Sequence, residues 1–107
     1  MTEAEVNDLL TRVGTAIAAS AKADGTDRAV RAARAAVSQL PADQLENARG
    51  IFVFVAGPDS LTLQEVDVAV GVVQRVTGPD GEILYRKSRG EMPARAVKVT
   101  IIACHLE

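Results

Sequence analysis

Aromatic residues are scarce in this chain of 107 residues, since Phe52, Phe54 and Tyr85 are the only three and tryptophan is absent. Proteins that bind single-stranded nucleic acids stack the bases on several aromatic rings. The formal net charge is -2, so the chain as a whole also lacks the basic character that binds phosphates. The composition therefore argues against a nucleic-acid partner and against an aromatic-lined small-molecule pocket.

Cysteine and histidine occur once each, as Cys104 and His105. One cysteine excludes an intramolecular disulfide framework and a multi-cysteine zinc site, which is typical of a cytoplasmic protein. Cys104 ends an apolar stretch, so we expect a buried structural thiol whose pKa is raised. His105 is expected to be a frayed terminal residue and not a base or a metal ligand.

Long apolar runs are missing as well. No run approaches the roughly 20 residues that span a bilayer, and residues 1–20 lack the basic start of a signal peptide. We therefore expect no direct membrane insertion. With 48% hydrophobic and 24% charged residues, the composition predicts one globular domain over residues 1–105. Leu106 and Glu107 resemble a cloning scar.

Three segments show the apolar periodicity of helices: residues 3–12, 26–40 and 61–76. Thr26 is expected to cap the second helix, followed by Asp27 in its first turn. The apolar stripe of that helix would consist of Val30, Ala33, Val37 and Leu40. Thr62 and Glu65 have the T-x-x-E spacing of a capping box at the start of the third helix.

Three further segments read as strands: residues 50–56, 82–88 and 95–104. The last two are separated by residues 89–93, which predicts an antiparallel hairpin. Residues 14–23 are ambiguous, because their alanines favour a helix whereas Gly14 favours a break followed by a strand buried on both faces. Helices that alternate with buried strands predict a two-layer α/β (α+β) domain with a mixed sheet.

Phosphate-binding loops are absent from the sequence, which contains neither G-x-x-x-x-G-K-[ST] nor G-x-G-x-x-G. The arginine row Arg28, Arg31 and Arg34 is expected to be a solvated helix face. The basic residues of 86–89 are expected to protect an edge strand. Residue types alone therefore indicate an α/β domain without a self-contained active site.

Four segments in order carry a family resemblance: ADGTDRA at 23–29, ARGIFVFVAG at 48–57, LTLQEV at 61–66 and VKVTIIA at 97–103. Together they resemble the C-terminal domain of the FtsZ cell-division GTPases of the tubulin superfamily. The resemblance covers residues 3–104. It implies that residues 14–23 are a strand and that the sheet has four strands with helices packed on it.

The resemblance also implies how the chain would work. In that family a preceding domain binds GTP, so no cofactor is expected in this chain, and neighbouring FtsZ-like subunits would be its partners. An acidic loop just before this domain would reach the GTP of the next subunit, and the chain begins at the end of that loop. Glu5 falls at the last aspartate of that loop, and Thr2 replaces an earlier one. Cys104 and His105 replace a threonine and a glycine of the family, beside the cleft where inhibitors bind.

The leading interpretation is the C-terminal domain of an FtsZ-like GTPase that serves longitudinal filament contact and, through Glu5, activates hydrolysis by its neighbour. A stand-alone adaptor or filament-capping module is one alternative. A small oligomeric α/β enzyme is another, and its polar groups would have to come from Arg28, Arg31, Glu65 and Arg86.

Overall fold

The computed structural model describes residues 15–78, 81–89 and 96–105. Seven elements follow in order: β1 (Thr15–Ala23), α2 (Arg28–Ser38), α3 (Ala42–Glu46), β2 (Gly50–Gly57), α4 (Leu63–Gln74), β3 (Glu82–Arg89) and β4 (Val97–His105). The predicted helix at 3–12, with Thr2 and Glu5, lies outside the described residues, as do Leu106 and Glu107.

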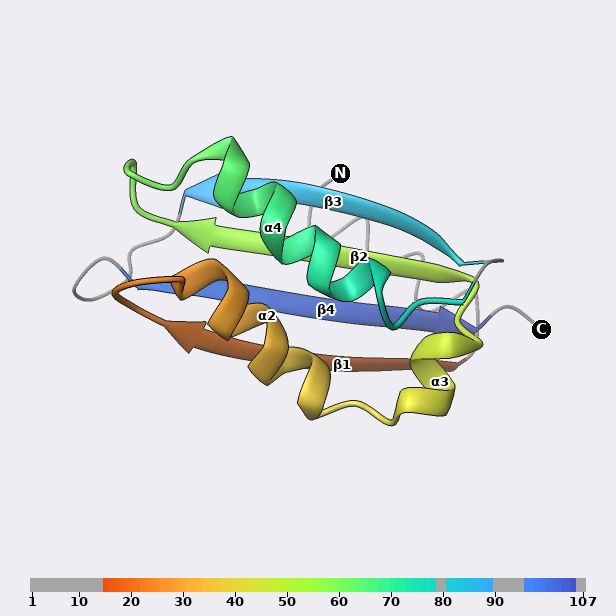
Figure 1. Ribbon diagram of the computed structural model, residues 1–107. Helices are drawn as coiled ribbons and strands as arrows, with labels where there is room; N and C mark the ends of the chain where they lie inside the picture. The colour runs from red at the N-terminus through yellow and green to blue at the C-terminus, as the bar shows by residue number, and fades with distance from the viewer. Residues whose placement is uncertain (1–14, 79–80, 90–95, 106–107) are drawn as a thin grey trace.

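The four strands form one mixed sheet in the order β1-β4-β2-β3 (Figure 1). Strand β4 pairs antiparallel with both β1 and β2, whereas β3 pairs parallel with β2. The predicted four-stranded mixed sheet with packed helices is therefore confirmed.

The predicted hairpin between the last two strands is wrong, because β2 lies between β3 and β4. Burial explains the arrangement. Along β4, Val97, Val99 and Ile101 are fully buried, so this strand belongs at the centre of the sheet. Most of β3 is exposed, and β3 is an edge strand, as expected for the segment that carries the basic residues of 86–89.

Residues 14–23 contain a strand and not a helix continuation, which settles the ambiguity of the sequence. Strand β1 lies at an edge of the sheet, however. Only one of its faces contacts the helix layer, through Ile17, Ala21 and Ala23, and Ala19 on the same face is buried. Ala16, Ala18 and Ser20 on its other face are exposed. The expectation of burial on both faces is therefore wrong.

Helices α2 and α4 lie side by side on one face of the sheet (Figure 1). The main core lies between the two layers and is built from aliphatic side chains of both. Helix α2 contributes alanines, whereas three residues of the predicted stripe are only partly buried: Val30, Val37 and Leu40. Because alanine has a minimal side chain, α2 can approach both the sheet and α4 closely.

The two long helices start differently. The T-x-x-E capping box of Thr62 and Glu65 is confirmed at α4. Asp27, and not Thr26, occupies the N-cap position of α2. It adopts a left-handed conformation with φ 56° and makes no side-chain capping bond. The predicted Thr26 cap is therefore wrong, because the turn continues through Asp27 before the helix begins.

A smaller cluster lies on the sheet face away from α2 and α4. Phe52 of β2 and Cys104 of β4 are buried there, with Phe54 and Ile102 packed against them. Residues of even number on β2 and β4 point to this side, because side chains alternate along a strand. No polar or charged side chain is buried in the described part of the chain.

Candidate functional site at the helix N-termini

Glu65 occupies the first turn of α4, where its carboxylate closes the capping box. The Thr62 amide donates to Glu65 Oε1 at 3.2 Å, and the Glu65 amide donates to Thr62 Oγ1 at 3.1 Å. This reciprocal pair satisfies two backbone donors that a helix start otherwise leaves unpaired. The local sequence thus fixes the Glu65 side chain at the start of α4.

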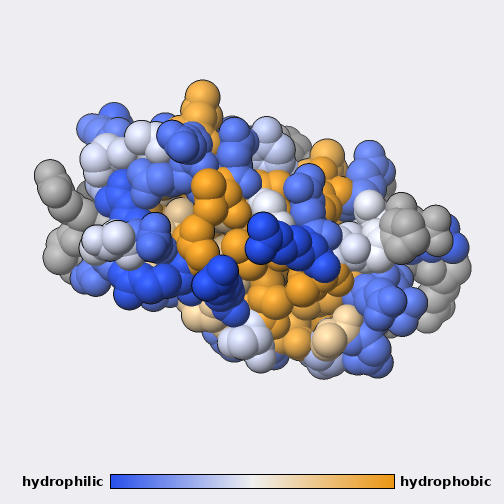
Figure 2. Space-filling view, viewed as in Figure 1, coloured by the Kyte–Doolittle hydropathy of each residue, from blue (hydrophilic) through white to orange (hydrophobic). Residues whose placement is uncertain are grey.

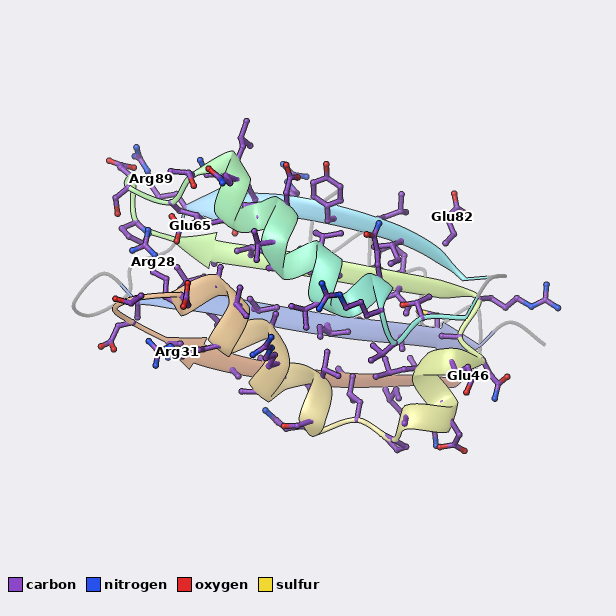
Figure 3. All side chains as sticks on the ribbon, viewed as in Figure 1. Arg28, Arg31, Glu46, Glu65, Glu82 and Arg89 are labelled. Atoms are coloured by element: carbon purple, nitrogen blue, oxygen red, sulfur yellow. The ribbon has the colours of Figure 1, made fainter. Side chains whose placement is uncertain are left out.

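Arg28, the first residue of α2, holds that carboxylate in a two-point ion pair. Arg28 Nε lies 2.7 Å from Glu65 Oε2, and Arg28 Nη2 lies 3.0 Å from Glu65 Oε1. Figure 3 shows the two side chains turned toward one another between α2 and α4. The Arg28 and Glu65 side chains are only 11% and 28% exposed, so the pair is partly shielded from water.

The electrostatics of this pair follow from its geometry. The hydrogen bonds from Arg28 lower the pKa of the Glu65 carboxyl below its ordinary value, against an opposing effect of burial. The same hydrogen bond raises the pKa of the Arg28 guanidinium. Both groups are therefore held in their charged forms, which suits a fixed clamp between two helices and not a proton-transfer role.

Arg31 anchors the turn between β1 and α2. Its guanidinium donates to the backbone carbonyl of Asp24 through Nη2 and to that of Thr26 through Nε, the latter at 3.0 Å. This turn contains Gly25 with φ 77° and the left-handed Asp27. The arginine row is therefore not one solvated face, because Arg28 and Arg31 are engaged and Arg34 is exposed.

A hollow of about 300 Å³ lies beside the Arg28–Glu65 pair. Its lining residues come from the starts of α2 and α4: Asp27, Ala29, Val30, Thr62, Gln64, Glu65 and Val68. Figure 2 shows hydrophobic surface reaching the solvent on this helix-bearing side, and Leu63 and Val68 are its exposed large residues on α4.

The four residues considered for an enzyme do not converge. Arg28 and Glu65 neutralise one another, and Arg31 is bound to backbone carbonyls. Arg86 lies on β3 and lines a different hollow, on the sheet face away from the helices. The arrangement therefore brings together a structural clamp and not the acid, base and binding groups of an active site.

The described residues contain no group of three or more potential metal ligands. Cys104 is buried, and burial raises the pKa of its thiol, as expected for a structural cysteine. The backbone of His105 continues strand β4 opposite Thr15, so the expectation of a frayed residue is wrong for the main chain. None of the helices in the described ranges is long and apolar enough to cross a membrane.

The Arg28–Glu65 pair was missed as a pair in the sequence. The two residues are 37 positions apart, and no local pattern links them. The capping box predicted that Glu65 lies in the first turn of one helix, and the helix periodicity predicted that Arg28 lies in another helix. The distance between the two helix starts is set by the tertiary packing alone.

The comparisons with known proteins agree on one family. The model of the FtsZ family, C-terminal domain, matches residues 14–107. The cell division protein FtsZ of a Wolbachia species is 27% identical over 97% of this chain and 27% of its own length. FtsZ of Magnetospirillum gryphiswaldense is 26% identical over 94% of this chain and 18% of its own length.

Solved structures extend the agreement to the fold. The W319Y mutant of M. jannaschii FtsZ superposes with a TM-score of 0.80 at 25% identity, over 98% of this chain and 32% of its own. The empty FtsZ dimer of the same organism gives a TM-score of 0.79 over 96% and 30%. The plasmid segregation protein TubZ, at 13% identity and TM-score 0.58 over 85% and 25%, shares the fold alone.

Proposed function

Because the chain belongs to the FtsZ family and matches its C-terminal domain, we propose that it provides a longitudinal contact between FtsZ-like subunits in a cytoplasmic filament. The observation that carries the proposal is the family match over residues 14–107 together with the shared fold. The chain spans about a quarter of the length of the Wolbachia relative, so the activity of a whole FtsZ protein is itself part of the proposal.

The division of labour within such a protein supports this role. The sequence contains no phosphate-binding loop, so GTP would bind elsewhere in a complete FtsZ-like protein. The polar residues at the helix starts are used to hold α2 against α4. The domain therefore offers a rigid scaffold whose contribution to GTP hydrolysis would come from a residue presented to the next subunit.

Glu5 is the residue proposed for that contribution, through its match to the last aspartate of the family's acidic loop. A carboxylate at this point would orient the water that attacks the GTP of the neighbouring subunit. Glutamate is one methylene longer than aspartate, so the hydrolysis it supports would be slower than with the shorter side chain, because catalysis is sensitive to ångström errors in position.

The test uses the 107-residue chain added to polymerising FtsZ from Magnetospirillum gryphiswaldense. A chain that offers one filament face should reduce the pelleted polymer at substoichiometric ratios and should show no GTP binding of its own by calorimetry. Unchanged pelleting at equimolar chain would contradict the filament contact, and micromolar GTP affinity of the isolated chain would contradict the division of labour.

The role of Glu5 needs a separate readout. The chain is added to an isolated FtsZ nucleotide-binding domain, and phosphate release from GTP is followed. We expect a rate increase with the wild-type chain, a smaller one with Glu5→Gln, and a larger one with Glu5→Asp. Glu3→Gln is the matched control, and an equal rate with Glu5→Gln and the wild type would remove Glu5 from the proposal.

The adaptor alternative gives a different pattern in the same experiments. An adaptor or capping module would reduce the pelleted polymer without any stimulation of GTP hydrolysis by the nucleotide-binding domain. The enzyme alternative has no support at the polar residues considered for it, since Arg28, Arg31 and Glu65 are engaged in structural contacts.

A further inference from the structure

Strand β1 forms one edge of the sheet, and β4 is its one partner among the described strands (Figure 1). The Glu82 amide donates to the Arg49 carbonyl at 3.0 Å, so the odd-numbered residues of β2 bond to β3 and the even-numbered ones to β4. Even-numbered residues of β4 therefore bond to β2 and odd-numbered ones to β1, whose partners are odd-numbered as well. The even-numbered residues of β1 thus direct their amide and carbonyl groups away from β4, to the open edge.

The open edge of β1 is accessible, because its four even-numbered residues are exposed: Ala16, Ala18, Ser20 and Lys22. A side chain already binds one of their carbonyl groups. Gln39, the C-cap of α2, donates through Nε2 to the Ser20 carbonyl oxygen at 2.9 Å. This bond is independent evidence that the Ser20 carbonyl points away from β4, and it shows that a hydrogen-bond donor reaches this edge.

The two edges of the sheet differ in how well they are protected against pairing with a further strand. Charged residues on an edge strand oppose such pairing. Strand β3 carries Arg86, Lys87 and Arg89, whereas β1 carries Lys22 as its one charge and contains no proline. Most of the other residues of β1 are alanines, whose small side chains leave room for a neighbouring strand. The edge that favours a further strand is therefore β1.

The sequence of β1 fits an antiparallel copy of itself. In a two-fold arrangement, one register pairs all nine residues, and it places Ala19 opposite Ala19 of the second copy. Ala18 then lies opposite Ser20, so the even-numbered residues pair with one another through their open backbone groups. Lys22 lies opposite Ala16, which keeps the two lysines about 20 Å apart and avoids repulsion between like charges.

We propose that β1 is a self-association edge, which pairs antiparallel with β1 of a second copy and joins the two four-stranded sheets into one. The same edge is used on both copies, so the assembly closes as a dimer. The Ser20 carbonyl would then accept from the Ala18 amide of the second copy, and Gln39 competes with that bond. The contact goes beyond the proposed filament contact, since it requires neither a nucleotide nor Glu5.

The first test is sedimentation equilibrium of the 107-residue chain. We expect a reversible dimer whose dissociation constant falls about fivefold in Gln39→Ala, because a competing hydrogen bond is removed. Gln74→Ala removes an exposed glutamine from the end of α4 and should change the constant by less than about twofold. Ala18→Pro should abolish the dimer and keep the native circular dichroism, because the β1–β4 pairing does not use the Ala18 amide.

Cysteine substitutions test the register without relying on a proline variant. Opposite residues of a non-hydrogen-bonded antiparallel pair have Cα atoms about 4.5 Å apart, within the range of a disulfide. Position 19 forms such a pair with itself in the dimer, whereas position 21 lies about 14 Å from its equivalent. With oxidised glutathione as the oxidant, Ala19→Cys should give a covalent dimer on a non-reducing gel, and the matched Ala21→Cys should not. The buried Cys104 is common to both variants.

Several outcomes would overturn the self-association edge. A chain that stays monomeric at every concentration, both as wild type and as Gln39→Ala, would do so. A dimer that persists in a folded Ala18→Pro variant would place the contact elsewhere, as would equal cross-linking of the two cysteine variants. Binding of a peptide with the β3 sequence EILYRKSR, without self-association of the chain, would assign the edge to a different polypeptide.

Discussion

At the scale of single residues, the Arg28–Glu65 pair makes the fold sensitive to acid. The pKa of Glu65 is lower in the folded chain than its ordinary value, so the charged carboxylate stabilises the fold above that ordinary value. This stabilisation is lost as the pH falls through the lowered folded pKa, because the carboxyl is then protonated in both states. We therefore expect the effect of removing the Glu65 charge to be full at neutral pH and to diminish as the carboxyl is protonated in acid.

Glu65→Gln isolates the charge, since glutamine can still accept the capping bond at this helix position. At pH 7 the variant should lose about 1 kcal/mol of unfolding free energy in urea, a modest value because the pair is partly exposed. The difference from the wild type should shrink below the ordinary carboxyl pKa of 4.5. Asp67→Asn removes an exposed carboxylate from the same helix and serves as the control. A loss that does not shrink as the pH falls below 4.5 would contradict the clamp.

At the scale of elements, two glycines that look equivalent in the sequence have opposite structural demands. A Cβ at Gly78, after α4, would lie 2.1 Å from the carbonyl oxygen of Glu46, the last residue of α3. A Cβ at Gly71, inside α4, would meet nothing within 4 Å. The close passage of the chain past α3 thus requires glycine at position 78, whereas position 71 has no steric requirement for it.

Gly78→Ala should therefore lower the free energy of unfolding by about 1–3 kcal/mol, because backbone must move to relieve the contact. Gly71→Ala should raise it by about 0.5–1 kcal/mol through helix propensity. Urea titrations of both variants measure the two effects under identical conditions. Equal stabilities of the two variants would show that α3 is not packed against Gly78.

How far the sequence predicts an element depends on how local its cause is. The capping box of α4 was predicted to the residue, because Thr62 and Glu65 are three positions apart. The short helix α3 was not predicted, and the β3–β4 hairpin was predicted wrongly. Adjacent strands in sequence suggest a hairpin, but the full burial of Val97, Val99 and Ile101 on the helix side of β4 decides in favour of the central position.

The candidate site shows the same difference between features with a local cause and features set by tertiary packing. The positions of Arg28 and Glu65 followed from helix patterns, whereas their pairing depends on how α2 packs against α4. The alanines of α2 make that packing close. Alanine contributes little to a hydrophobic periodicity, so the sequence pattern indicated the larger Val30 and Val37 as the buried stripe. The family resemblance supplied what local patterns could not, namely that residues 14–23 form a strand.

At the scale of the whole molecule, stability is concentrated in the layer between the helices and the sheet. Ile101 lies at the centre of β4, is fully buried, and belongs to the cluster that joins both layers. Leu84 lies on the edge strand β3 on the other face and is 46% exposed. Ile101→Ala should cost about 2–5 kcal/mol, because it removes a buried side chain and leaves a cavity.

A loss of that size is a large share of the 5–15 kcal/mol typical of a domain, so Ile101→Ala should unfold the whole sheet at a clearly lower urea concentration. Leu84→Ala should change the unfolding free energy by less than about 1 kcal/mol, because little apolar surface is lost from the interior. Circular dichroism and the reactivity of the buried Cys104 thiol report on the helices and on the opposite face, respectively. Because β4 carries residues of both hydrophobic clusters, the two probes should give one coincident unfolding transition in every variant. Separate midpoints would show that the two faces of the sheet unfold independently.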